Sequence, residues 1–169
     1  IHKDAITVDA WEFERAKMTF LNEKGEEETI QLGAYQTNFV TDGPECYSVV
    51  YAGRGTLQDY EGMDVTGKLV LVDINQRDEW WINYPVYQAH LKGAAAVIAA
   101  QTGGYGEVDE RALNAQDIAG PSNAPAFSIA RHDADQLKKM LQGRSEVQVL
   151  FDASTKVIPA QTTYNIVGE

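Results

Sequence analysis

Residues 66–73 read Thr-Gly-Lys-Leu-Val-Leu-Val-Asp, and residues 92–100 read Lys-Gly-Ala-Ala-Ala-Val-Ile-Ala-Ala. Each stretch holds a continuous apolar run after a glycine, which is typical of a strand covered on both faces. Between them, Pro85 suits the first turn of a helix, where its missing N–H is harmless. Gly93 suits the left-handed residue that ends such a helix at Lys92. A strand, a helix and a second strand predict a right-handed parallel crossover.

Further strands and a second helix are expected around this crossover. Residues 17–32 predict a hairpin with a turn at residues 22–25, because apolar and polar residues alternate on both sides of it. Residues 45–52, 126–129 and 147–152 are expected to be strands. Asp133 is expected to cap a helix that runs to Gln142, with a buried stripe formed by Ala134, Leu137 and Leu141. We therefore expect a mixed α/β fold, a β-rich sandwich or sheet of about seven strands with two flanking helices.

Length and composition argue against several classes of function. The chain has 169 residues and a net charge of −11, which argues against binding to nucleic acid or to an anionic membrane surface. Its length predicts one domain, and no apolar run approaches the roughly 20 residues of a membrane-spanning helix. The single cysteine, Cys46, excludes an internal disulfide and is expected to be a buried small residue of a strand. A start at Ile1 and a strand-like end at residues 165–169 suggest a piece of a longer protein.

A search for catalytic residues finds weak candidates. His2, His90 and His132 lack the spacing of a zinc site. Ser128 and either Asp133 or Asp135 flank His132, which allows a hydrolase triad, but ordinary helix capping is the better account of this arrangement. The sequence therefore predicts no catalytic, cofactor-binding or metal-binding residue.

One loop stands out as a candidate contact surface. After Asn75 it carries Arg77, Trp80, Trp81 and Tyr84, which are the residue types that anchor binding hot spots. Each tryptophan can pack under the loop as core or face a partner, and both alternatives stay open. Tyr105, in the glycine-rich connection that follows residue 100, is a weaker candidate for the same role.

Three motifs in order resemble the protease-associated domain family. Residues 65–72 resemble its Gly-Lys-hydrophobic strand, residues 89–98 its Lys-Gly-Ala helix-to-strand element, and residues 124–143 its last strand and helix. The resemblance spans about residues 45–151. Residues 51–60 and 164–169 are similar to the version inserted in zinc aminopeptidases of the glutamate-carboxypeptidase-like family. Residues 73–77 depart from the family's Arg-Gly and Cys pattern, so its disulfide-linked or glycosylated versions are not supported.

The resemblance implies a fold of the swivelling β/β/α type and one domain over residues 1–169. Residues 160–169 would begin the return to a catalytic domain that supplies the zinc ligands. The chain itself would be non-catalytic, and its parent a zinc metallo-aminopeptidase. It would act as a lid, or as a substrate-access, specificity and protein-interaction domain, with the catalytic domain and a peptide or protein substrate as partners. Family analogy favours an extracytoplasmic or secreted location.

Two alternatives remain at this point. The chain could be a free-standing domain that binds peptides or proteins without any peptidase, or a small hydrolase in its own right. The sequence after Glu169 would separate the first alternative from the accessory role, and an aminopeptidase assay with added zinc would test the second.

Overall fold

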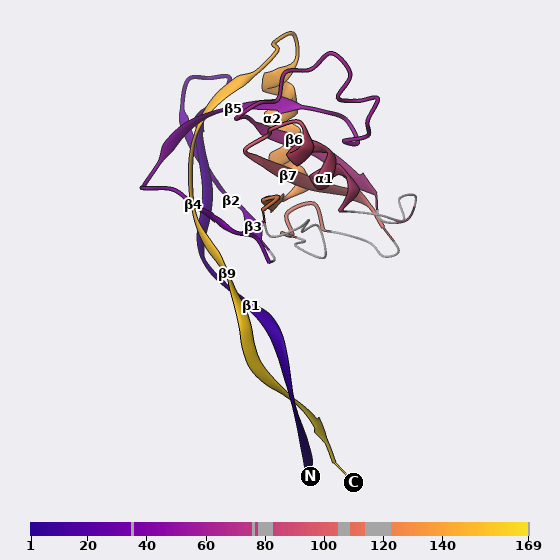
Figure 1. Ribbon diagram of the computed structural model, residues 1–169. Coiled ribbons are helices and arrows are strands. Elements are labelled where there is room, and N and C mark those ends of the chain that lie inside the picture. The colour runs from indigo at the N-terminus through magenta and orange to yellow at the C-terminus, as the bar shows by residue number, and fades with distance from the viewer. Residues whose placement is uncertain (35, 76, 78–82, 105–108, 114–122, 169) are drawn as a thin grey trace.

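Four parallel strands form the centre of a single sheet. A computed structural model describes residues 1–34, 36–75, 77, 83–104, 109–113 and 123–168. In it β5 (Glu45–Tyr51), β6 (Leu69–Asn75), β7 (Ala96–Gly103) and β8 (Ala126–Ile129) lie side by side and parallel (Figure 1). Helix α1 (Tyr84–Leu91) joins β6 to β7, with Pro85 in its first turn and Gly93 at φ +81° after its end. The predicted parallel crossover is confirmed.

Antiparallel strands extend the sheet on the other side of β5. β9 (Val147–Val167) pairs with β5, β1 (His2–Leu21) pairs with β9, and β2 (Glu27–Gln31) pairs with β1 as the predicted hairpin. Two short strands, β3 (Gly33–Ala34) and β4 (Phe39–Val40), pair with β8 and β9. The mixed α/β sheet with two helices is confirmed. The described residues form nine strands rather than about seven, because residues 33–43 contribute two short ones.

Two apolar cores lie on opposite faces of the parallel strands. On one face, Leu69 and Leu71 of β6 pack in a cluster with α2 (Arg131–Leu141) and with the Phe127 and Phe151 rings, which meet edge to face at 5.1 Å. On the other face, Val70 and Val72 pack in a cluster with residues of α1. Alternate residues of β6 therefore enter different cores, which explains why its sequence is apolar without interruption.

β1 and β9 leave the body together as a long two-stranded ribbon that carries both chain ends at its tip (Figure 1). Their pairing runs from His2 opposite Val167 to Thr19 opposite Leu150. Only the inner parts of these strands, from Lys17 and up to Asp152, were expected from alternation. Residues 165–169 were expected to be strand-like, but the pairing of the outer parts was not predicted, because strands so far apart in the chain leave no local sign of their partner. These outer parts are mostly exposed, apart from Ala16 and residues 153–155.

Two local expectations were wrong. Helix α2 begins at Arg131, its N-cap is Ala130, and Asp133 lies in its first turn beside His132 rather than at the cap. The helix starts earlier because β8 ends at Ile129 and Ala130 already has the extended conformation of a cap (φ −62°, ψ 141°). Cys46 does lie in a strand, but it is exposed and its Sγ donates to Gln148 Oε1 at 3.2 Å.

Candidate functional site

The candidate contact surface begins where β6 ends. Asn75 is the last residue of β6, and its Oδ1 accepts a hydrogen bond from the backbone N–H of Arg77 at 3.0 Å. It lies opposite Gly103, after a register shift in the pairing of β6 with β7. A Cβ at position 103 would come within 2.6 Å of Asn75 Oδ1, so the glycine leaves the space that the Asn75 side chain fills. Asn75 therefore shapes the turn that leads into the candidate loop.

Two of the predicted contact residues are exposed at this edge. Arg77 is exposed, and Tyr84, the first residue of α1, keeps 42% of its surface accessible. In the described part of the chain no hydrogen bond joins their side chains. Trp80, Trp81 and Tyr105 lie outside the described residues, so their roles stay predictions. The carboxyl ends of parallel strands are a common place for ligands to bind.

A second polar group at the same end of the strands was missed by sequence reasoning. Tyr51 Oη donates to Asp73 Oδ2 at 2.6 Å, and Lys138 Nζ donates to Asp73 Oδ1 at 2.5 Å. Lys138 Nζ also lies 5.3 Å from the centre of the Tyr51 ring and 3.6 Å from Asp135. Partial burial, together with the hydrogen bond to Asp73, raises the pKa of the Tyr51 phenol well above its usual value. These contacts tie α2 to the ends of β5 and β6 and hold the edge of the sheet in place.

The loop after β5 is pressed against the start of α1. Gly55 has φ +68°, and a Cβ there would lie 2.6 Å from Pro85 Cβ. The Asp59 carboxylate braces the loop by accepting from Thr56 N at 2.9 Å and from Thr56 Oγ1 at 2.7 Å. The position of α1, and with it Tyr84, thus depends on a close approach that only a glycine allows.

The described residues contain no set of three or more His, Cys, Asp or Glu side chains placed to hold a metal ion. His2 contacts Asp4, His90 contacts Asn123, and His132 contacts Asp133, each in a different part of the fold. Ser128 is 1% exposed, and its hydroxyl has no hydrogen-bond partner in the described structure, so His132 does not orient it. The triad geometry is therefore not formed. Among the described helices, none has the length and apolar character needed to cross a bilayer.

Comparison with solved structures shows what the whole chain is similar to. It superposes on the aminopeptidase from Aneurinibacillus sp. strain AM-1 with a TM-score of 0.67 and 17% identity, covering 96% of this chain and 36% of that one. Its superposition on a peptidase M28 precursor from Shewanella amazonensis SB2B has a TM-score of 0.64 and 19% identity, covering 97% of this chain and 39% of that one. Its superposition on BSAP, a zinc aminopeptidase from Bacillus subtilis, has a TM-score of 0.62 and 17% identity, covering 95% of this chain and 35% of that one.

These likenesses establish the fold, and the chain spans little more than a third of each of those structures. A comparison with curated protein sequences finds no match. Residues 38–137, more than half of the chain, match the PA domain family, in agreement with the resemblance carried by the strand and helix motifs. The chain therefore belongs to the PA domain family.

Proposed function

We propose that this chain is a non-catalytic accessory domain of a zinc aminopeptidase and that it shapes the access of peptide substrates to a separate catalytic domain. The observation that carries the proposal is the β1/β9 ribbon, on which the first and last strands run side by side away from the body (Figure 1). Two adjacent strands of this kind can connect the body to another domain at one place. The fold likeness to aminopeptidases that are much longer than this chain supports the same assignment.

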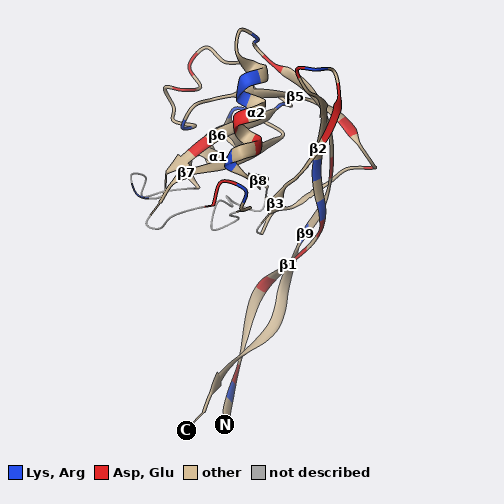
Figure 2. Cartoon of the chain, turned by 180° about the vertical axis from the view of Figure 1, so that it is seen from behind, with Lys and Arg blue, Asp and Glu red and all other residues tan. Residues whose placement is uncertain are grey.

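The surface of the ribbon suits contact with a second domain. Ile6 and Val8 lie on one face of the ribbon, and Tyr164 and Ile166 lie on the other; the four expose between 37% and 66% of their surface. The outer ribbon carries few charged residues (Figure 2). A two-stranded ribbon alone in water is at best marginally stable, so it gains from packing against a neighbour. In this proposal that neighbour is the catalytic domain, residues 1–169 form one domain, and residues 160–169 lead back to the catalytic domain.

We assign contact with substrate to a different surface, the edge of the sheet where the parallel strands end. Arg77 and Tyr84 are exposed there, and Trp80, Trp81 and Tyr105 complete the proposed contact set. In this proposal the catalytic domain would hold the zinc ion, since BSAP, to which this chain is similar in fold, is named a zinc aminopeptidase. An extracytoplasmic setting remains our expectation for the parent enzyme.

The test is steady-state kinetics of the full-length peptidase with peptides of increasing length. We expect Arg77→Ala and Tyr84→Ala, and also the double change of Trp80 and Trp81 to alanine, to raise KM for longer peptides. The kcat for a single aminoacyl anilide should not change, because the chemical step lies in the other domain.

The matched control is Arg144→Ala, which removes another exposed arginine, in the loop between α2 and β9. If KM for long peptides is the same in all these variants, the substrate-access role is wrong. Equal peptide affinity of the separate chain and the full-length enzyme would instead favour the free-standing binding domain.

A further inference from the structure

The outer ribbon is interrupted by a bulge. Val8 lies opposite Gln161 and Ala10 lies opposite Ile158, so Asp9 of β1 faces two residues of β9, Pro159 and Ala160. Ala160 has φ +57°, a left-handed conformation that is unfavourable for a residue with a Cβ. Pro159 has no N–H to donate across the ribbon. The regular ladder is therefore broken on β9 at this point, and the backbone there is strained.

One side chain closes the bulge. Asp9 Oδ1 accepts a hydrogen bond from the backbone N–H of Ala160 at 3.0 Å. Both residues are exposed, so water competes directly for this bond. Beyond it, the ladder resumes from His2 opposite Val167 to Val8 opposite Gln161, and every residue of that outer segment is exposed.

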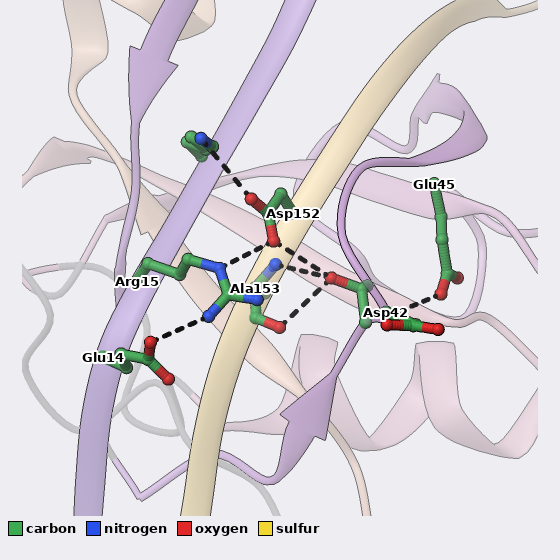
Figure 3. Close-up of polar contacts among 8 residues, drawn as sticks. Glu14, Arg15, Asp42, Glu45, Asp152 and Ala153 are labelled. Atoms are coloured by element: carbon green, nitrogen blue, oxygen red, sulfur yellow. Dashed lines mark hydrogen bonds and ion pairs between the residues drawn. The ribbon is translucent and has the colours of Figure 1, made fainter.

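On the body side of the bulge the ribbon is anchored by buried polar groups. Asp152 of β9 is 6% exposed, and its carboxylate accepts from Arg15 Nε at 2.8 Å and from Thr41 Oγ1 at 3.3 Å (Figure 3). Lys17 Nζ lies 3.4 Å from the other carboxylate oxygen.

The backbone and a neighbouring threonine add to this anchor. Thr41 N–H donates to the carbonyl oxygen of Ala153 at 2.9 Å, and Thr155 Oγ1 lies 2.8 Å from the Thr37 carbonyl oxygen. These contacts join β9 to the segment around β4, and Arg15 and Lys17 join β1 to β9 through Asp152, so the root of the ribbon is tied to the body.

We propose that the bulge formed by Asp9, Pro159 and Ala160 is a hinge. The outer segment, residues 2–8 and 161–167, turns about it while the root stays fixed to the body, and the Asp9–Ala160 hydrogen bond holds one setting of the hinge. In the proposed accessory domain this motion would swing the body relative to the catalytic domain. The hinge itself is a property of this chain and can be tested without peptidase activity.

The experiment measures distances between spin labels by pulsed electron resonance in the 169-residue chain with Cys46→Ser as background. One pair, Gln58→Cys with Tyr164→Cys, reports tip to body, and a second, Gln58→Cys with Lys156→Cys, reports root to body. We expect Asp9→Ala to widen the tip-to-body distance distribution at least about twofold and to leave the root-to-body distribution unchanged. Asp9→Asn keeps an oxygen acceptor and should stay as narrow as the parent.

The matched control is Asp4→Ala, which removes another exposed carboxylate of the outer ribbon, one that contacts the His2 ring at 2.7 Å. It should leave both distributions narrow. An unchanged tip-to-body width in Asp9→Ala would show a rigid kink, and equal widening of both pairs would place the motion at the root; either result overturns the hinge. Loss of amide protection throughout residues 2–8 would overturn it as well, since a hinge leaves the outer pairing intact.

Discussion

Gly55→Ala tests whether the loop after β5 is held against α1 by a close contact. A Cβ at this position would lie 2.6 Å from Pro85 Cβ and 3.1 Å from Val72 Cγ1. Val72 is fully buried in the core beneath α1, and Pro85 is buried at the start of that helix, so neither side chain can move aside freely. The substitution therefore combines a backbone penalty with overpacking.

The two contributions can be given magnitudes. Gly55 has φ +68°, where a residue with a Cβ costs about 1–2 kcal/mol. Overpacking a filled core site adds about 1–3 kcal/mol. The free energy of unfolding should therefore fall by about 2–5 kcal/mol, a large part of the roughly 5–15 kcal/mol that stabilises a typical domain. For a chain of this length the melting temperature should fall by about 10 °C.

The assay is urea unfolding followed by circular dichroism, with Gly62→Ala as the matched control. Gly62 has φ +74°, but no heavy atom lies within 4 Å of the position of its Cβ. That variant should lose only the backbone contribution, about 1–2 kcal/mol. If Gly55→Ala destabilises the chain no more than Gly62→Ala does, the loop is not pressed against α1 and the reasoning fails.

Three further predictions concern single polar groups. The hydrogen bond from Arg15 holds the pKa of Asp152 below its usual value, so the carboxylate adds stability that is lost as pH falls below about 4. Asp152→Asn should therefore flatten the fall of unfolding free energy with acid, and curves parallel to the parent's would contradict this. Ser128→Ala removes a buried hydroxyl that has no partner among the described residues, and it should raise the free energy of unfolding by about 1 kcal/mol. A lower melting temperature would show that the hydroxyl is paired. In a pH titration, the parent should show more tyrosinate absorbance than Tyr51→Phe only above the usual pH range of tyrosine ionisation. A difference between the two proteins that appears near pH 10 would refute the raised pKa of Tyr51.

The central elements could be predicted because burial on both faces leaves a plain trace in sequence. β6 and β7 are uninterrupted apolar runs, and Pro85 and Gly93 mark the limits of α1 by their backbone restrictions. The start of α2 was misplaced because Asp133 is as plausible an N-cap in the sequence as Ala130 is. In the structure Ala130 is the N-cap, because the end of β8 leaves it extended just before the helix. Helix ends are decided by such local competition.

The candidate site was found only in part. Arg77 and Tyr84 could be chosen from residue type and from their place after a strand. Tyr51, Asp73 and Lys138 could not be associated, because their contacts depend on how α2 lies across the sheet. The exposure of Cys46 was missed for a similar reason, since alternation identifies the two faces of a strand but does not say which face is covered.

By itself, the sequence determined the class of fold and the parallel crossover, because these rest on apolar periodicity and on glycine and proline positions that act locally. The family followed from the resemblance of its motifs, which the family match over residues 38–137 bears out. Only the tertiary structure decided that β1 and β9 continue as an exposed ribbon, that Asp152 is buried at its root, and that Asp9 closes a bulge opposite Ala160. Those features join residues more than 130 positions apart, and pairing at such a separation leaves no mark in local residue patterns.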